Sequence, residues 1–300
     1  VVFEADITSK NKEKILKMLP QNFKLRFFDI TTYIYDNYPE FKMYTRRHWS
    51  ISTFYRIFCP LIMQKYQKVL YLDSDMCVNH DVSELFDVDD KGYEIKAVVG
   101  TSTPILDKFP EIKKHMINVL KLNNPCNYFN AGMIMYNIKN INADSYDKRF
   151  RAVCDTKDLM FLDQDILNMI FEDKVELIHN KWNYIYGSCE WNPNYLNIIG
   201  GEYRKKFIEA RENPYIIHYT TARKPWNYPS GEFADVWWSY ARETSFYEEI
   251  LFKNLKTGEK KRTVNSWFVH KHIIRFLSVP LLKIRHDKNS YRVYLFKIIP

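Results

Sequence analysis

The stretch Lys68-Val69-Leu70-Tyr71-Leu72-Asp73-Ser74-Asp75 combines a short apolar run with two carboxylates that are separated by one residue. Residues 69–72 are partly β-branched and aromatic, which predicts a strand buried on both faces of a mainly parallel sheet. Asp73 and Asp75 would follow its carboxyl end, where open α/β sheets bind ligands. Because side chains two residues apart share a face of an extended chain, both carboxylates are expected to reach one cation.

Strand and helix patterns alternate on both sides of this stretch. Strands are predicted at residues 1–3, 24–28, 95–99, 129–138, 175–178 and 215–219, and helices at residues 8–19, 50–63, 108–122, 161–171 and 202–212. This alternation is typical of an α/β domain, here residues 1–230. After Gly231 the pattern changes, and amphipathic helices are predicted at residues 233–251 and 266–279. We therefore expect a second, helical region at residues 231–300.

The net charge of +8 comes from the end of the chain. Residues 251–300 hold 12 Lys and Arg against Glu259 and Asp287, whereas residues 1–250 hold 32 basic and 34 acidic residues. Aromatic residues such as Trp267 are interleaved with these cations. A basic and aromatic segment of this kind fits an anionic membrane surface, with nucleic acid as the competing partner. We expect the membrane surface and no nucleic acid.

Other features of the composition narrow the class of protein. The five cysteines are scattered and form no Cys-x-x-Cys pair, so they are expected to be reduced, without a zinc or redox role. No apolar run approaches the roughly 20 residues that a bilayer span needs, and no signal peptide opens the sequence. The sequence therefore predicts a cytoplasmic protein that associates peripherally with the inner face of the membrane.

Two further residues have the chemistry to complete a metal and phosphate site with Asp73 and Asp75. His218 follows the apolar run Tyr215-Ile216-Ile217, so it is expected at a strand end, and a nitrogen ligand beside two carboxylates favours manganese over magnesium. Lys224 lies six residues later, where its cation could bind a diphosphate. Structural alternatives remain open: a solvated turn for the acids, a hydrogen-bonded imidazole and a surface lysine.

Several other polar residues suit sugar or nucleotide binding. Arg56 lies off the apolar stripe of the predicted helix at 50–63, where it could face phosphate or ribose. Short side chains that hydrogen-bond sugar hydroxyls occur at Asn130, Asp163, Gln164 and Asp165. Helix capping and surface exposure are the structural alternatives for these residues.

The order of four motifs resembles glycosyltransferase family eight, a family of retaining nucleotide-sugar transferases, and especially its bacterial lipopolysaccharide glucosyl- and galactosyltransferases. Val69-Leu-Tyr-Leu-Asp-Ser-Asp-Met is similar to the metal motif, and Tyr128-Phe-Asn-Ala-Gly-Met-Ile-Met-Tyr-Asn-Ile to the sugar-binding strand. Asp163-Gln-Asp-Ile-Leu-Asn is similar to the start of the catalytic helix, and His218-Tyr-Thr-Thr-Ala-Arg-Lys-Pro-Trp to the loop from His to Lys. Four motifs in this order are far less expected by chance than one.

This resemblance implies a GT-A-like, Rossmann-like fold and a site for a UDP-sugar that depends on Mn²⁺, with Mg²⁺ as the alternative. The metal would be held by Asp73, Asp75 and His218. The catalytic residues would be Gln164, near the anomeric carbon, and Asp163. The donor would be bound by Arg56, Ser74, Asn130, Ala131, Gly132, Asp165 and Lys224. The first strand and helix of the family have no counterpart here, so we expect that a first βα unit is missing from this chain.

The resemblance also implies a reaction, the transfer of glucose or galactose from UDP to a lipopolysaccharide, lipooligosaccharide or other surface glycan. The cation would neutralise the charge that grows on the departing UDP. Retention has two routes: attack from the leaving-group face, or a covalent glycosyl intermediate. Because the amide of Gln164 is a poor nucleophile, we favour the first.

Two alternatives come from other classes of protein. A haloacid-dehalogenase-type phosphatase or phosphotransferase also places Asp-x-Asp after a buried strand, with Asp73 as nucleophile and Asp75 as acid. That class gives His218 and Lys224 no role. The second alternative is a non-enzymatic adaptor that binds membranes or nucleic acid through residues 251–300.

Overall fold

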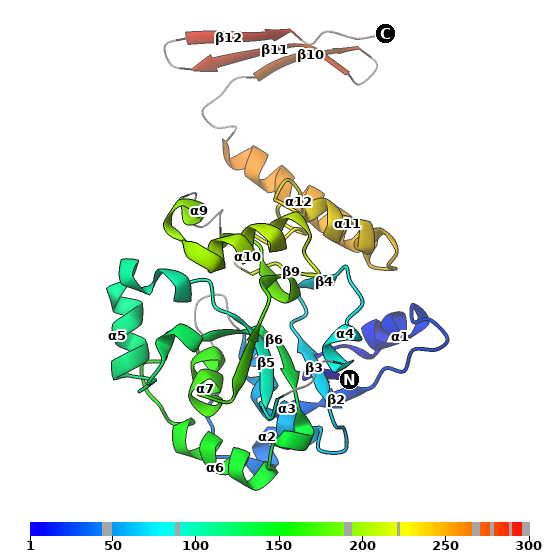
Figure 1. Cartoon of the computed structure of the whole chain (residues 1–300). Helices are drawn as coiled ribbons and strands as arrows, with labels where there is room; N and C mark the ends of the chain where they lie inside the picture. Colours follow the sequence, from blue (N-terminus) through cyan, green and yellow to red (C-terminus); the bar gives the residue numbers. More distant parts are fainter. Residues whose placement is uncertain are drawn as a thin grey trace. The chain divides into compact units, whose positions relative to one another are not determined.

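The computed structural model describes residues 1–43, 50–87, 91–188, 194–220, 223–265, 271–276, 279–287 and 290–295, with side chains described up to residue 256. The chain divides into two compact units, Val1–Tyr240 and Ala241–Pro300. Figure 1 shows the strands of the first unit at its centre with helices around them.

A four-stranded sheet forms the centre of the first unit, in the order β3 (Val69–Leu72), β6 (Phe129–Tyr136), β5 (Ile95–Val99) and β7 (Val175–Ile178). β3 and β5 both pair antiparallel with β6, and β7 pairs parallel with β5. Three strands therefore share one direction and β6 opposes them. Every residue of β6 except Asn130 is buried, which explains why its apolar run shows no polar alternation.

The strand that precedes the two acids forms at residues 69–72 as predicted, but its surroundings differ from the prediction. Its four residues are half-buried and not enclosed on both faces. The reason is its position, because β3 lies at one end of the sheet, where β6 is its paired strand. The predicted α/β class is confirmed, although the sheet is mixed and its hydrogen bonding is mostly antiparallel.

A second sheet of three strands follows in the order β4 (Met76–Val78), β9 (Ile216–His218) and β8 (Tyr184–Ile185). β4 pairs antiparallel with β9 in a register that sets Met76 opposite His218, and β8 runs parallel to β9. Residues 73–75 are the connection along which the chain leaves β3 and enters β4. The register of the second sheet thus brings His218 to this connection.

Helices pack against the large sheet and enclose the core. α7 (Asp163–Ile170) contacts β6 and the 3₁₀ helix η1 (Ile51–Phe58), and α6 (Ala143–Val153) contacts α7 and α3 (Cys59–Ile62). The ring of Phe58 lies 5.3 Å from that of Phe150 and 5.9 Å from that of Phe41, measured between centroids. Phe58 and Phe150 are completely buried. Much of the high aromatic content of the chain therefore serves core packing.

The remaining elements of the first unit connect these layers. They are β1 (Val2–Glu4), α1 (Ser9–Lys17), β2 (Phe27–Asp29), α2 (Ile30–Asn37), α4 (Glu84–Asp87), η2 (Thr103–Lys108), α5 (Pro110–Asn118), η3 (Pro125–Asn127), η4 (Ile138–Asn140), η5 (Asn180–Asn183), α9 (Tyr195–Ile198) and α10 (Gly201–Glu212). β1 and β2 pair in parallel across α1. The side chain of Thr8 caps α1 by accepting a hydrogen bond from the backbone N–H of Asn11.

The end of the chain contains strands where a helix is predicted. α11 (Ala234–Arg242) and α12 (Tyr247–Asn265) are followed by β10 (Lys271–Phe276), β11 (Val279–Asp287) and β12 (Ser290–Leu295), which form an antiparallel sheet. The predicted helix at 266–279 is therefore wrong over 271–276 and at Val279, while residues 266–270 and 277–278 lie outside the described part. These strands are rich in Ile, Val and Tyr, which favour strands, and the sequence Asp287-Lys-Asn-Ser290 is typical of a turn. These preferences outweigh the short helical spacing of apolar residues on which the predicted helix is based.

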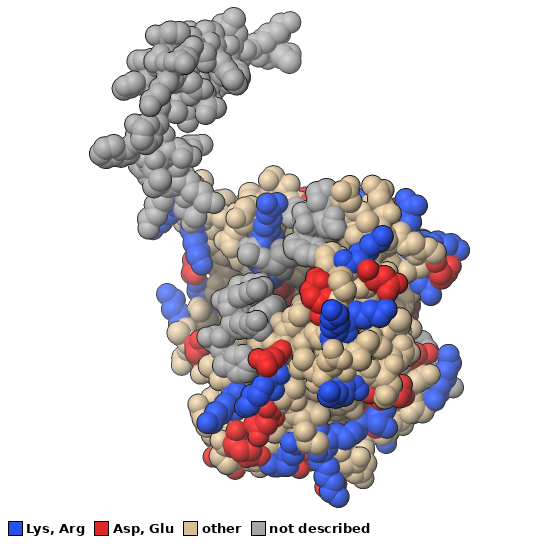
Figure 2. All heavy atoms as spheres, turned by 90° about the vertical axis from the view of Figure 1, so that its left-hand side faces the viewer, with Lys and Arg blue, Asp and Glu red and all other residues tan. Residues whose placement is uncertain are grey.

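Basic and acidic side chains are intermingled on the face of the molecule that Figure 2 presents. This mixture agrees with the nearly balanced charge of residues 1–250. Among the helices that the structure describes, none combines the length and the apolar character that crossing a bilayer requires.

Candidate functional site

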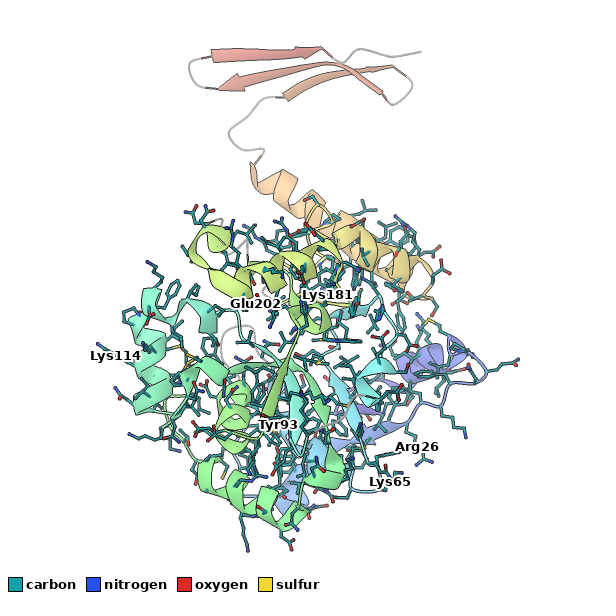
Figure 3. The ribbon with its side chains drawn as sticks, in the orientation of Figure 1. Arg26, Lys65, Tyr93, Lys114, Lys181 and Glu202 are labelled. Carbon is teal, nitrogen blue, oxygen red and sulfur yellow. The ribbon has the colours of Figure 1, made fainter. Side chains whose placement is uncertain are left out.

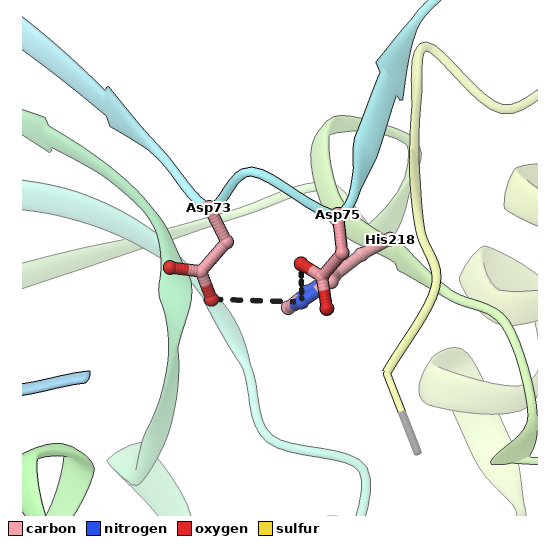
Figure 4. Close-up of side chains that lie close together, drawn as sticks. All are labelled: Asp73, Asp75 and His218. Carbon is pink, nitrogen blue, oxygen red and sulfur yellow. Dashed lines mark ion pairs between the residues drawn. The ribbon is translucent and has the colours of Figure 1, made fainter. Parts of the chain in front are cut away.

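Two carboxylates and an imidazole meet where β3 passes into β4 (Figure 4). Nε2 of His218 lies 3.3 Å from Oδ1 of Asp75 and 3.7 Å from Oδ2 of Asp73. One ligand atom from each side chain lies within 4.8 Å of the others. The imidazole is 5% exposed, whereas the carboxylate side chains are 19% and 21% exposed. The cluster therefore opens to solvent on the side of its acids.

Gly132 of β6 leaves the space that the imidazole occupies. A Cβ atom built at this position would lie 2.2 Å from Cε1 of His218 and 3.0 Å from Oδ2 of Asp73. The first distance is far below any normal contact, so only glycine fits beside the ring. The backbone carbonyl of Gly132 also accepts a hydrogen bond of 2.8 Å from the N–H of Asp73. This small residue, for which the resemblance implies a contact with the donor, thus makes room for the side chain of His218.

The ligand atoms of this cluster fit a divalent cation. Oδ1 of Asp75 is buried and accepts no hydrogen bond, although it faces Nε2 of His218. A buried carboxylate oxygen without a donor is costly unless a cation approaches it. Two carboxylates and one imidazole are ligands for Mg²⁺ or, with the nitrogen, preferably Mn²⁺.

Lys224 lies beside the same carboxylate. Its Nζ donates to Oδ2 of Asp75 and to the backbone carbonyl of Tyr219. Burial acts to raise the pKa of Asp75. The contact with His218, when its imidazole is protonated, and the contact with Lys224 outweigh burial and hold this pKa well below its ordinary value. Asp75 is therefore a carboxylate at neutral pH, as a metal ligand must be.

Arg56 of η1 holds a second pair of acids together. Its Nη1 donates to Oδ2 of Asp73 at 3.0 Å and to the carbonyl of Ala131 at 2.7 Å, and its Nε lies 2.9 Å from Oδ2 of Asp163. Burial raises the pKa of Asp163 to about 6, and the Arg56 cation and the hydroxyl of Thr53 only partly offset this effect. Arg56 thus lies between Asp73 and Asp163, and the phosphate or ribose contact expected from the sequence stays a prediction.

Gln164, at the start of α7, is held in one orientation. Its Oε1 accepts hydrogen bonds from the N–H of Ala131 at 3.2 Å and from Nδ2 of Asn130 at 3.1 Å. Its Nε2 donates to the hydroxyl of Tyr128, and that hydroxyl donates to Oδ1 of Asp165 at 2.6 Å. Asp165 is completely buried, so it reaches the site only through Tyr128 and Gln164.

The structure gathers the residues that the sequence singled out around the connection 73–75. Ser74 is exposed between the two acids, and Asn130, Ala131 and Gly132 line the start of β6 beside them. Sequence reasoning missed Tyr71, whose hydroxyl donates to Oδ1 of Asp73 at 2.9 Å. Its spacing of two residues from Asp73, which directs both side chains to one side of the extended chain at the end of β3, is the signal that could have found it.

Two more residues of the site carry no motif of their own. Thr53 donates from its hydroxyl to Oδ1 of Asp163 at 2.5 Å, and Asn183 faces the imidazole of His218 at 3.0 Å. Both follow from tertiary contacts between elements that are distant in the chain, so no local pattern predicts them.

Comparison with known proteins gives a family match. The sequence profile described as glycosyl transferase family 8 matches residues 1–230. Glycosyltransferase GlyB of Streptococcus pneumoniae is 30% identical over 198 residues, which are 65% of this chain and 43% of GlyB. A lipopolysaccharide 1,3-galactosyltransferase of Salmonella typhimurium is 26% identical over 199 residues, which are 62% of this chain and 54% of that protein. The chain spans about half the length of these two relatives.

Solved structures agree with this match. The apo structure of the bifunctional glycosyltransferase WbbM has a TM-score of 0.73 and 29% sequence identity, over 84% of this chain and 45% of that one. The GT-A-like fold expected from the sequence is thereby confirmed.

The contact between Gly132 and His218 yields a first prediction. Gly132→Ala would push the imidazole away from Asp75, since its Cβ cannot share the space of the ring. We expect the affinity for Mn²⁺, measured by calorimetry, to fall by at least about tenfold, as when ligand orientation is lost. Gly100→Ala is the matched control, because its Cβ would meet neighbours only at 3.4 Å. An unchanged affinity in Gly132→Ala would contradict the role of His218, held beside Gly132, as a ligand of the cation.

The pKa of Asp163 yields a second prediction, on stability. Its pKa is about 6 in the folded chain and 3.8 without burial, so the folded state retains the proton to higher pH. The free energy of unfolding should therefore decrease as pH rises from about 4 to 6, by up to about 3 kcal/mol from this group, and stay at the lower level above. Urea unfolding at pH 4.5 and 6.5 measures this decrease.

Asp163→Asn, which cannot titrate, is the comparison in that experiment. Its stability should change less over this interval than that of the wild type, whatever the absolute loss from removing one of the two carboxylates that Arg56 contacts. Equal changes in both proteins would refute the raised pKa.

Proposed function

This chain belongs to glycosyltransferase family 8, and from this premise we propose that residues 1–230 form a catalytic domain that transfers glucose or galactose from a UDP-sugar, with retention, to a surface glycan. The observation that carries the proposal is the convergence of Asp73, Asp75 and His218 beside Lys224. We propose Mn²⁺, with Mg²⁺ as the alternative, as the cation held by the first three residues.

Charge balance supports a cation-dependent reaction. Asp73, Asp75 and Asp163 carry three negative charges against the two cations Arg56 and Lys224. With one surplus negative charge, the residues alone would repel a diphosphate, whereas a bound divalent cation makes the site attractive to it. The cation supplies electrostatic stabilisation of the UDP leaving group. In this proposal, Lys224 binds the same diphosphate as a second cation.

The hydrogen bonds of the site favour attack of the acceptor from the leaving-group face. A covalent intermediate needs a carboxylate nucleophile at the anomeric carbon. Asp163 is engaged by both Arg56 and Thr53, and Gln164 offers an amide whose oxygen already accepts two hydrogen bonds. We propose that Gln164 and Asp163 position the transferred sugar. Arg56 is proposed to contact the ribose or the phosphates of the donor.

Donor contacts complete this assignment. We propose that Ser74, Asn130, Ala131 and Gly132 lie along the donor, and that Asp165 contributes through Tyr128 and Gln164. The acceptor is proposed to be a lipopolysaccharide, a lipooligosaccharide or another surface glycan, because one relative is a lipopolysaccharide 1,3-galactosyltransferase. The phosphatase alternative, with Asp73 as nucleophile, is overturned by the family match.

The metal assignment predicts the effect of one substitution. Asp75→Asn removes one negatively charged ligand while keeping the size of the side chain, so Mn²⁺-dependent UDP binding measured by calorimetry should weaken by more than about 100-fold. A screen of UDP-sugars for Mn²⁺-dependent donor hydrolysis then identifies the donor in the wild type. Asp81→Asn, at an exposed acid beyond β4, is the control and should bind as the wild type does.

Two results would contradict the assignment. If the Asp75→Asn variant bound UDP normally in the presence of Mn²⁺, the metal assignment would be wrong. A folded wild type that hydrolyses no UDP-sugar would remove the transferase proposal.

We also propose that residues 231–300 associate with the anionic inner face of the cytoplasmic membrane, without binding nucleic acid. Support comes from the 12 basic and two acidic residues in 251–300, compared with 32 and 34 in the rest of the chain. The exposed apolar side chains of Leu251, Phe252 and Leu255 on α12 add hydrophobic area to this charge. A cytoplasmic location follows from the same proposal, since UDP-sugar donor and acceptor would meet there.

This membrane proposal predicts a charge-dependent affinity. Lys260, Lys261 and Arg262 changed together to Gln should lose about 3 kcal/mol, on the order of 100-fold, in binding to phosphatidylglycerol vesicles measured by sedimentation. The control changes the exposed Lys10, Lys65 and Lys114, of which the last two are labelled in Figure 3, and should bind normally. Equal loss in both variants, or tighter binding to DNA than to vesicles, would contradict the proposal.

A further inference from the structure

A chain of side-chain amides joins Gln164 to His218 across the site. Nδ2 of Asn130 donates to Oε1 of Gln164 at 3.1 Å, and Oδ1 of Asn130 accepts from Nδ2 of Asn183 at 2.9 Å. Oδ1 of Asn183 lies 3.0 Å from Nδ1 of His218. Asn183 ends η5 and is 1% exposed. Its amide is thus committed to two partners, of which one belongs to the metal cluster.

Backbone groups fix which end of each amide is the oxygen. The N–H of Gly132 donates to Oδ1 of Asn130 at 3.0 Å, and the N–H of Ala131 donates to Oε1 of Gln164 at 3.2 Å. A backbone N–H can only donate, so the atom that faces it must be the amide oxygen. The two backbone hydrogen bonds are consistent with each other, because with these orientations Asn130 donates from its NH₂ group to the oxygen of Gln164.

The same constraint passes on to the imidazole. Oδ1 of Asn130 can only accept, so Asn183 presents its NH₂ group to Asn130 and its oxygen to His218. The ring nitrogen that faces this oxygen, Nδ1, must therefore carry the proton. In a neutral imidazole Nε2 is then unprotonated, and its lone pair is directed at Asp73 and Asp75.

We propose that Asn183 is a positioning residue that selects the Nδ1–H tautomer of His218 and so keeps Nε2 free to bind a divalent cation. The inference rests on the metal site of the proposed function. Partners that bond the second nitrogen of a metal-binding histidine fix its tautomer and ring orientation, and their loss costs 10–100-fold in metal affinity. Asn130 links this partner to Gln164, so one amide chain orients both residues.

The tautomer is measured directly in the metal-free full chain. In protein with ¹⁵N-labelled histidine, at a pH where imidazole is neutral, nitrogen chemical shifts distinguish the protonated from the unprotonated ring nitrogen. The signals of His218 are identified by their loss in His218→Gln. We expect Nδ1 protonated and Nε2 unprotonated, and the opposite assignment would overturn the proposal whether or not the protein binds metal. The expected tautomer in a chain that binds no Mn²⁺ would support the selection of the tautomer by Asn183 and contradict the proposed metal site.

Substitutions of Asn183 separate tautomer selection from packing. Asn183→Leu has a similar size but no acceptor, so the Nε2–H tautomer should appear and the Mn²⁺ affinity should fall by about 10–100-fold. Asn183→Asp keeps an acceptor and should restore the Nδ1–H tautomer. An Nδ1–H tautomer that persists in Asn183→Leu would overturn the role of Asn183. Should this variant fail to fold, the wild-type spectrum still decides whether the tautomer is the proposed one.

Asn137→Leu is the matched control for a buried amide. Asn137 is also completely buried, and its Nδ2 donates to the carbonyl of Tyr93, labelled in Figure 3, at the opposite end of β6 from Asn130. This variant loses a comparable hydrogen bond but should retain the Nδ1–H tautomer and the Mn²⁺ affinity. A change of tautomer in this control equal to that in Asn183→Leu would show a general packing effect and overturn the proposal.

Discussion

The antiparallel register that sets Met76 of β4 opposite His218 of β9 is the contact on which the site depends. It brings an imidazole from late in the chain to the connection between β3 and β4, where both acids lie. A shift of one residue in this register would turn His218 to the other face of its sheet. Because Gly132 has no side chain, the imidazole of His218 has room beside β6. The three ligands of the proposed cation thus come from a sheet junction and need no flexible loop to meet.

The charges around this junction are arranged in two linked groups. Arg56 bridges Asp73 and Asp163 in the buried part, and Lys224 holds Asp75 at the more exposed part. The acids exceed the bases by one charge, so the proposed cation would relieve repulsion between the carboxylates and would also make the site attractive to the proposed diphosphate. The amide chain from Gln164 to His218 adds orientation to this charge balance. Metal binding and sugar positioning are in this account properties of one hydrogen-bonded network.

Much of this arrangement could be predicted from the sequence, for physical reasons that differ between residues. The strand at 69–72 and its two acids form a local pattern, as do the helix start at Asp163 and the strand that ends at His218. Arg56 could be singled out as a candidate site residue because it lies outside the apolar stripe of the predicted helix at 50–63. Asn183 could not be predicted, since its role arises from a contact between η5 and β9 that no spacing encodes.

Two errors of prediction have a common origin. The half-buried state of β3 depends on which strands stand beside it, and the sheet at 271–295 depends on pairing between segments. Periodicity within one segment reports its own amphipathic character but not its neighbours, so it cannot distinguish an end strand from a central one, or a short strand from a helical turn.

The central claim is that Asp73, Asp75 and His218 hold one divalent cation. Anomalous diffraction from crystals of the chain with Mn²⁺ and UDP tests it most directly. The account predicts a manganese peak at about 2.0–2.3 Å from a carboxylate oxygen of each acid and from Nε2 of His218, in contact with the diphosphate. A peak at another place, or one that His218 does not reach, would contradict it.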